Sequence, residues 1–167
     1  MVPRKRLRRL AKIEKAKQGM QIIDYKQLSP AQADAFVKMR DKFKWKNNPT
    51  HDEFMRVAVK NGKPIGYISG KEKNECNWIN EFYVSRPYQR KTVGKQLLFD
   101  YIRNRARKGD LRFQIYPSED AVKALLNIKE GADRAGGINI ERQEGRHKFT
   151  LDVRPGFFSE PKRLMVR

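Results

Sequence analysis

Hydrophobic and polar positions follow two different periods along this chain, and together they predict a mixed α/β fold. Segments rich in β-branched and aromatic residues are predicted to form strands or hairpins: residues 20–28, 54–70, 77–84, 111–116 and 136–153. Segments with apolar residues three or four positions apart are predicted to form helices: residues 29–45, 94–108 and 118–132. The resulting order, β-α-β-β-β-α-β-α-β-β, indicates one mixed sheet with helices on its faces.

Turn signals divide two of these segments into hairpins. Asn61-Gly62 lies between two β-rich runs and is the strongest short hairpin signal. Glu144-Gly145 occupies the same kind of position in the last segment. We therefore expect a turn at each dipeptide.

The segment 29–45 carries a well-marked helix start. Ser29 is the expected N-cap, and Gln32 three residues later completes a capping box. The apolar stripe of this helix comprises Phe36, Met39 and Phe43, with Arg40 at the same helical spacing. A charged residue therefore lies beside the face that is expected to be buried.

Composition adds a strong positive charge to this picture. The 167 residues suit one domain, and their net charge is +19. Residues 1–19 hold eight Lys and Arg against one Glu, and residues 154–167 hold four against one. We expect basic tails at 1–19 and 154–167 around a domain at 20–153 that is itself basic. Such a field attracts nucleic acid and phosphate-bearing cofactors.

The single cysteine, Cys76, excludes an intrachain disulfide and a Cys-based zinc site, so no metal is expected. No apolar run approaches the length of a membrane span, and the basic N-terminus lacks the apolar segment of a secretory signal. A cytoplasmic location is therefore expected, with association with a virion or nucleoprotein assembly as the alternative.

A short basic loop joins the strand ending Phe82-Tyr83-Val84 to the next helix. It reads Gln89-Arg90-Lys91-Thr92-Val93-Gly94. Unpaired amides and a partial positive charge at a helix N-terminus bind phosphate, and cations strengthen that binding. A basic loop that caps a helix with nothing bound is the alternative, because neither GxxxxGK[ST] nor GxGxxG is present.

The element order and the run "INEFYVSRPYQRKTVGKQLL" resemble the GNAT superfamily of acyl-CoA-dependent acetyltransferases. The family's Q/R-x-x-G-x-G/A loop is matched by Gln89 and Gly94, with Thr92 at the first glycine position. The resemblance covers residues 20–153. It implies a GNAT-like, mostly antiparallel central sheet with helices on both faces, and it leaves the basic N- and C-terminal extensions outside.

The resemblance also implies acetyl-CoA as co-substrate. It gives pantetheine contacts to Phe82, Tyr83 and Val84, and places Ser118 near another cofactor-binding position. It gives pyrophosphate contacts to the loop and helix start, namely Gln89, Arg90, Lys91, Thr92, Val93, Gly94 and Lys95. Thr92 departs from the family pattern, because a β-branched residue disfavours positive φ and crowds a ligand.

Two residues are candidates for proton transfer. Glu81 precedes the loop, where the family often keeps a carboxylate base; the alternative is a charge on the outer sheet face. Leu125 falls where the family's acid tyrosine is expected, so Tyr116 at a strand end is the candidate acid, with Tyr83 as another. The alternative for Tyr116 is strand-end packing. Trp45, Trp78 and Phe157-Phe158 are expected to pack in the core or against a tail rather than to form base-stacking platforms.

The implied function is N-acetylation of an amine by direct transfer from acetyl-CoA. The alternative is a catalytically weak or inactive GNAT-like protein, acting as a nucleic-acid-associated or structural component of a larger viral or ribonucleoprotein assembly. Partners are therefore an acyl-CoA and, through the basic tails, nucleic acid or an acidic partner. Oligomeric state and acceptor are left open.

Overall fold

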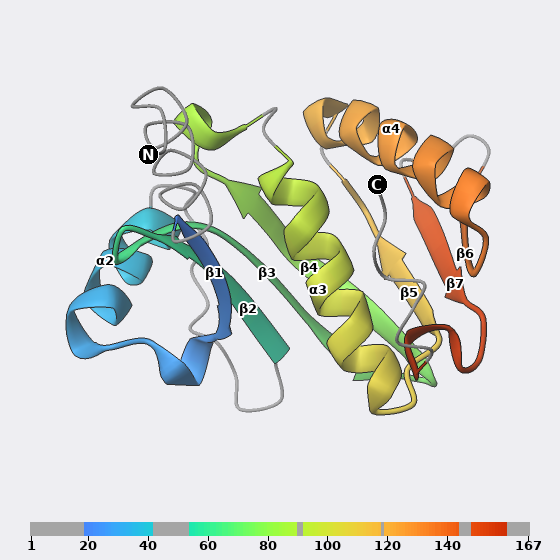
Figure 1. The fold of residues 1–167 in the computed structure, drawn as a ribbon, viewed down its shortest axis with the longest axis horizontal. Helices are drawn as coiled ribbons and strands as arrows, with labels where there is room; N and C mark the ends of the chain where they lie inside the picture. The colour runs from blue at the N-terminus through green and yellow to red at the C-terminus, as the bar shows by residue number, and fades with distance from the viewer. Residues whose placement is uncertain (1–18, 42–53, 90–91, 118, 144–147, 160–167) are drawn as a thin grey trace, which may run out of the picture.

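A seven-stranded sheet forms the centre of the molecule in the computed structural model, which describes residues 19–41, 54–89, 92–117, 119–143 and 148–159. The strand order is β1-β2-β3-β4-β5-β7-β6 (Figure 1). β4 and β5 pair in parallel, and the other neighbours pair antiparallel. The strands are β1 (Met20–Asp24), β2 (Phe54–Lys60), β3 (Lys63–Lys73), β4 (Cys76–Val84), β5 (Arg112–Ile115), β6 (Ile138–Arg142) and β7 (Phe149–Val153).

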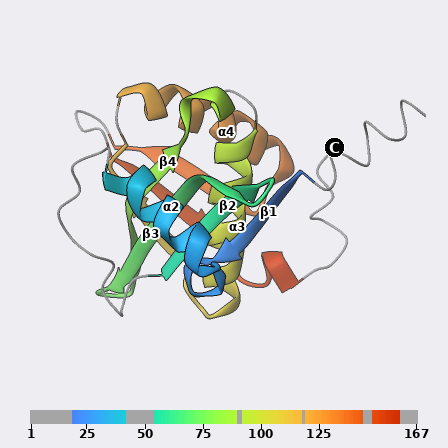
Figure 2. The same cartoon turned by 90° about the vertical axis from the view of Figure 1, so that its left-hand side faces the viewer.

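Helices cover both faces of this sheet, as predicted. They are α2 (Pro30–Asp41), α3 (Val93–Arg107) and α4 (Glu119–Ala135). Turning the molecule brings α2 to the front of the sheet, with α3 and α4 behind it (Figure 2). The described residues therefore have the mixed, mostly antiparallel α/β architecture that the sequence predicted.

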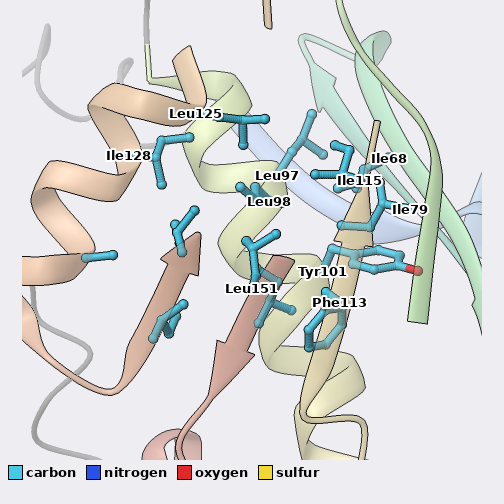
Figure 3. Packing of buried hydrophobic residues seen from close by; sticks show 14 of the residues in the cluster. Ile68, Ile79, Leu97, Leu98, Tyr101, Phe113, Ile115, Leu125, Ile128 and Leu151 are labelled. Atoms are coloured by element: carbon cyan, nitrogen blue, oxygen red, sulfur yellow. The ribbon is translucent and has the colours of Figure 1, made fainter. Parts of the chain in front are cut away.

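Each face of the sheet has its own apolar cluster. The larger cluster lies under α3 and α4, where Leu97, Leu98 and Leu125 meet Phe113 and Leu151 of the sheet (Figure 3). The smaller one lies under α2 and contains Phe36, Met55, Val57, Val59 and Tyr67. Phe157 and Phe158 are buried in the larger cluster, in agreement with the sequence.

Local signals set several element ends. Gln32 N donates to Ser29 Oγ at 3.2 Å and Ser29 N to Gln32 Oε1 at 3.0 Å, which confirms the capping box. Asn61 and Gly62 both have positive φ, 51° and 75°, which is the backbone of the expected tight hairpin turn. The turn at Glu144-Gly145 lies outside the described residues.

Three predicted boundaries were wrong. The first strand ends at Asp24 rather than at residue 28, because Asp24 accepts from Lys26 N at 2.8 Å and caps a 3-10 turn. The last helix was predicted to end at residue 132 and continues to Ala135, after which Gly136 takes a positive φ of 68°. The first hairpin was predicted to end at residue 70, but β3 continues to Lys73, where a tight turn at Asn74-Glu75 with positive φ at both residues leads into β4.

An irregularity in β4 changes which side chains face each helix layer. Ser69 pairs with Glu81 and Gly70 with Ile79, so Asn80 is an extra residue, a β-bulge. Ile79 and Phe82 consequently both face the α3 cluster, while Glu81 faces α2. The bulge lies where β4 leaves its parallel neighbour, and it positions the site described next.

Most of both predicted tails and the end of the helix predicted at 29–45 lie outside the described residues. Within the described part of the chain, no helix combines the length and apolar character needed to cross a membrane.

Candidate active site

β4 and β5 are paired over a short distance only. In the described residues their register comprises Asn77 with Phe113, Trp78 with Gln114 and Ile79 with Ile115. Beyond Ile79, β4 continues to Val84 beside β3 alone. Figure 1 shows the two strands together at one end and apart at the other, where α3 begins. The edge of β4 that faces this opening is therefore available for pairing with an extended ligand.

The start of α3 lies next to this edge. The helical ladder begins with Gln96 N donating to Thr92 O at 2.9 Å, so the amides of Val93, Gly94 and Lys95 precede it. A Cβ placed on Gly94 would lie 3.5 Å from the Phe82 ring, an ordinary contact. Packing against the strand therefore does not require glycine here, and the absence of a side chain leaves room between the helix start and Phe82 and Val84 of β4.

Thr92 takes the left-handed conformation that glycine favours, with φ 54° and ψ −9°. Its side chain makes no capping hydrogen bond. The loop therefore keeps a glycine-type backbone path at this position despite the β-branched residue, at a cost of about 1–2 kcal/mol in backbone strain.

Gln89 closes the loop from its other end. Its Nε2 donates to Val84 O at 2.8 Å, which links the loop to the end of β4. One N–H of this side chain is therefore engaged within the protein. Arg90, Lys91 and Ser118 lie outside the described residues. Lys95 Nζ lies 5.9 Å from the Phe99 ring centroid, one turn along α3 rather than over the loop.

The pantetheine candidates have different surroundings. Phe82 and Val84 pack toward the α3 cluster, whereas Tyr83 packs toward the α2 cluster near Tyr67, with a ring centroid distance of 6.1 Å. Their side chains thus hold β4 between the two layers. Any contact with pantetheine would use their backbone.

Glu81 is buried under α2 in a bidentate ion pair. Arg40 Nη2 donates to its Oε1 at 2.7 Å and Arg40 Nε to its Oε2 at 3.0 Å. Only 5% of Arg40 and 9% of Glu81 is exposed. Burial, followed by the nearby Glu81 carboxylate, raises the pKa of Tyr67, so this phenol stays protonated beside Glu81. Glu81 is thus a firmly held carboxylate. Its role as base stays a prediction.

Tyr116 follows β5 and is 56% exposed. Its ring stacks on Trp78 with centroids 6.0 Å apart and an interplanar angle of 6°. Lys148 Nζ, from the residue before β7, lies 5.3 Å from the Trp78 centroid and 5.8 Å from the Tyr116 centroid. Trp78 is half-buried rather than in the core, and its packing against a tail stays a prediction. The role of Tyr116 as acid stays a prediction.

Sequence reasoning did not identify two of these partners. Arg40 carried a signal, because it is a cation beside the apolar stripe of α2, but nothing in the sequence identified Glu81 as its partner. Lys148 carried no signal, since its place over Trp78 depends on the register between β5 and β7. Cys76 is buried, and this burial raises the pKa of its thiol.

Known structures share this architecture. The N-acetyltransferase PaiA from Thermoplasma acidophilum, solved with coenzyme A, is 17% identical over 81% of this chain and 99% of its own, with a TM-score of 0.57. The ribosomal-protein-S18-alanine N-acetyltransferase from Escherichia coli is 15% identical over 79% of this chain and 90% of its own, with a TM-score of 0.53. At these identities the likeness concerns the fold.

Sequence comparisons add the family. No curated protein sequence gives a significant match. The model of the acetyltransferase (GNAT) family matches residues 20–125, a span that contains β4, the loop and α3. More than half of the chain thus matches, over the elements that build the opening beside β4, and the chain belongs to the GNAT acetyltransferase family.

Proposed function

We propose that this protein transfers the acetyl group of acetyl-CoA directly to an amine. The observation that carries the proposal is the edge of β4 beyond Ile79, open on the β5 side and beside the start of α3. A strand edge offers amides and carbonyls to the amide-containing pantetheine arm, and a helix start offers amides to a diphosphate. Co-crystallisation of the related fold of PaiA with coenzyme A supports the same choice.

The helix start suits a diphosphate for three reasons. The amides of Val93, Gly94 and Lys95 precede the helical ladder, Gly94 has no side chain to block approach, and Thr92 holds the left-handed turn. Gln89 fixes the turn to the end of β4. Arg90 and Lys91 are proposed to add charge on the basis of the sequence alone, and Ser118 is proposed as a further contact on the same basis.

Direct transfer requires two proton movements. The acceptor loses a proton as its nitrogen bonds to the acetyl carbon, and the leaving CoA thiolate gains one. We propose Glu81 as the group that takes the first proton, through one water, and Tyr116 as the donor of the second. Because Arg40 holds both oxygens of Glu81, taking a proton weakens that ion pair. The role of Glu81 as the base is therefore tested with the Glu81→Gln variant.

The cofactor site is tested by calorimetric titration of acetyl-CoA into protein freed of nucleic acid. Gly94→Glu puts a negative charge at the helix start and should weaken binding at least about tenfold. Gly94→Gln adds nearly the same volume without charge and should weaken it less. Both should fold, since a Cβ at Gly94 meets only ordinary contacts. Equal affinities of wild type and Gly94→Glu for acetyl-CoA would show that the diphosphate does not bind at this site.

The chemistry is tested by CoA release with a panel of amines. Glu81→Gln keeps the shape of the side chain and one hydrogen-bond acceptor for Arg40. We expect it to lower kcat about 100-fold or more if Glu81 is the base. Normal turnover by this variant would remove that role and leave Glu81 as a residue that holds α2 on β4.

Charge favours a second function, association with nucleic acid. The net charge of +19 is large for 167 residues. Such binding should weaken steeply with salt, because it releases counterions. Filter binding of a labelled oligonucleotide between 50 and 300 mM salt would test it. Salt-insensitive binding, or none, would exclude this function.

A further inference from the structure

We propose that the acceptor is an amine on an acidic peptide segment, and that the segment docks on the sheet face formed by β4, β5 and β7 on the α2 side. The proposal rests on the acetyl transfer proposed above and names its acceptor class. Four observations carry it: a partly exposed aromatic pair, a shallow cavity beside it, a buried oxygen without a donor in the described residues, and cations around all three.

The helix on this side of the sheet does not cover this face. α2 packs over β2 and β3, and Figure 1 places it behind β1–β3, away from β5, β7 and β6. On the remaining half of the sheet, the described side chains on this side are polar or aromatic. The apolar residues of these strands, Phe113, Ile115 and Leu151, point to the opposite side, toward α3 and α4. Trp78 and Tyr116 form a stacked platform on it, with Lys148 beside both rings.

A cavity of about 470 Å³ adjoins this platform. Its lining includes Trp78, Cys76 and Lys73 near the β3–β4 turn, together with Arg112 and Gln114 from β5. It lies toward the start of β4, at the far end of the strand from the α3 loop, so it is separate from the proposed cofactor site. A volume of this size is ordinary for a ligand site.

An unsatisfied polar atom points to the chemistry of the occupant. Gln114 Oε1 is buried and has no hydrogen-bond partner in the described residues. A buried carbonyl oxygen without a donor costs about 1–3 kcal/mol, and a ligand N–H removes that cost. Peptide N–H groups are such donors. Ser69 Oγ is also without a partner in the described residues, but Ser69 does not line the cavity, whereas Gln114 does.

The local charge favours acidic residues on the peptide. Lys73, Arg112 and Lys148 outnumber Glu75 of the cavity and Asp152, which pairs with Arg112 at 2.8 Å. The net charge of +19 extends the same sign over the molecule and disfavours polyamines and other cationic acceptors. Aromatic rings flanked by cations accept the aliphatic stems and carboxylates of Glu and Asp.

Strand geometry sets the spacing between platform and chemistry. Trp78 pairs with Gln114, and the opening between β4 and β5 begins two residues later, at Asn80. This corresponds to about 7 Å along the strand. An extended peptide therefore has its acidic residues two to four positions from the reacting amine. In the reaction that nitrogen gains the acetyl group and loses a proton, and CoA leaves as the protonated thiol.

Fluorescence anisotropy tests the docking surface directly. The probes are seven-residue peptides with a free N-terminal amine, a dye at the C-terminus, and Glu, Gln or Lys at the third to fifth positions. At 50 mM salt we expect the Glu peptide to bind at least tenfold more tightly than the Lys peptide. Lys148→Glu should abolish that preference, and Tyr116→Ala should weaken the Glu peptide at least threefold.

The matched control is Lys123→Glu, because Lys123 is exposed on α4, on the other side of the sheet. It changes the net charge equally and should leave the peptide preference intact. Equal affinities for the three peptides overturn the proposal, as do equal effects of Lys123→Glu and Lys148→Glu. Tighter binding of a single-stranded oligonucleotide that Lys148→Glu abolishes also overturns it and assigns the platform to nucleic acid.

Separate readouts keep this proposal distinct from acetyl transfer. Acetylation of a neutral amine without selective binding of the Glu peptide would support the transferase and overturn the docking surface. Selective peptide binding without CoA release would support the docking surface and overturn the transfer.

Discussion

Arg40 and Glu81 are 41 residues apart in sequence and form a bidentate ion pair between α2 and β4, at 2.7 and 3.0 Å. Both are nearly fully buried, so neither charge has water as an alternative partner. Removing one partner should therefore cost much more than the pair itself contributes.

We expect Arg40→Met to destabilise the protein by about 3–5 kcal/mol, because it leaves a buried carboxylate without its partner. The double variant Arg40→Met/Glu81→Leu should recover most of that loss. Arg112→Met is the control, since the Arg112–Asp152 pair is 60% and 40% exposed. Urea unfolding at neutral pH measures all three. A double variant as unstable as Arg40→Met would contradict this account.

Thr92→Gly should stabilise the fold. Glycine adopts φ 54° without strain, whereas a β-branched residue does not. Glycine also has greater freedom in the unfolded chain, which offsets part of this effect. The net increase in the free energy of unfolding should therefore be about 0.5–1 kcal/mol. Thr92→Val keeps the branch and should not gain. The midpoints of urea unfolding compare the stabilities of the two variants with that of the wild type. A loss of stability in Thr92→Gly would refute the strain argument.

Gly70 should not tolerate a side chain. A Cβ there would collide with the carbonyl oxygen of Trp78 and the hydroxyl of Tyr101, and Tyr101 Oη donates to Asn77 Oδ1 at 2.6 Å. We expect Gly70→Ala to cost about 2–4 kcal/mol, through strain and the disturbed hydrogen bond.

Gly131→Ala is the matched control for Gly70→Ala. In the interior of α4 the new Cβ would meet nothing nearer than Lys95 Nζ at 4.0 Å. Because alanine has a higher helix propensity than glycine, Gly131→Ala should raise the free energy of unfolding by about 0.5–1 kcal/mol. Thermal unfolding measures both substitutions, and similar effects of the two would show that packing at Gly70 is looser than the structure indicates.

Two substitutions at Tyr116 separate its proposed roles. Tyr116→Phe removes the hydroxyl and keeps the ring that stacks on Trp78, so kcat should fall about 100-fold if Tyr116 is the acid. The KM for an acidic peptide should stay within twofold. Tyr116→Ala removes the ring and should raise that KM as well. Unchanged kcat in Tyr116→Phe would end the acid role and leave the platform role.

Alkaline pH should destabilise the wild type more than Tyr67→Phe. The pKa of Tyr67 is raised in the folded protein, first by burial and then by Glu81. Its stabilising contribution is complete below the unfolded pKa of about 10 and is lost as pH rises beyond it. Urea unfolding at pH 9 and 11 compares the two proteins. An equal loss in both would mean that Tyr67 ionises normally.

The fold could be predicted because its signals are local. The capping box at Ser29, the Asn61-Gly62 turn and the periods of the helices act within a few residues, so they identify elements without knowledge of their neighbours. The order of those elements, with the loop sequence that resembles the family, then indicated the sheet and the face of the helices. The predicted end of the first strand was wrong because the side chain of Asp24 accepts a backbone hydrogen bond and ends the strand.

The site could be predicted only in part, because its contacts cross strands. That Glu81 meets Arg40 depends on the bulge at Asn80, and the stack of Tyr116 on Trp78 depends on the parallel register of β4 and β5. Neither a bulge at Asn80 nor a parallel register is dictated by a turn or a residue type. The loop from Gln89 to Gly94 was recognisable because its residues are consecutive in the sequence and precede a predicted helix.

The single extra residue in β4 also limits how this segment can change length. Without Asn80, Ile79 and Glu81 would be consecutive, and strict alternation would still place Ile79 toward α3 and Glu81 toward α2. The strand can therefore lose this one residue without exchanging its faces, whereas a one-residue change in a regularly paired part of the strand would exchange them. Sequence alignments of related chains should therefore place a one-residue gap in β4 at Asn80 rather than elsewhere in the strand.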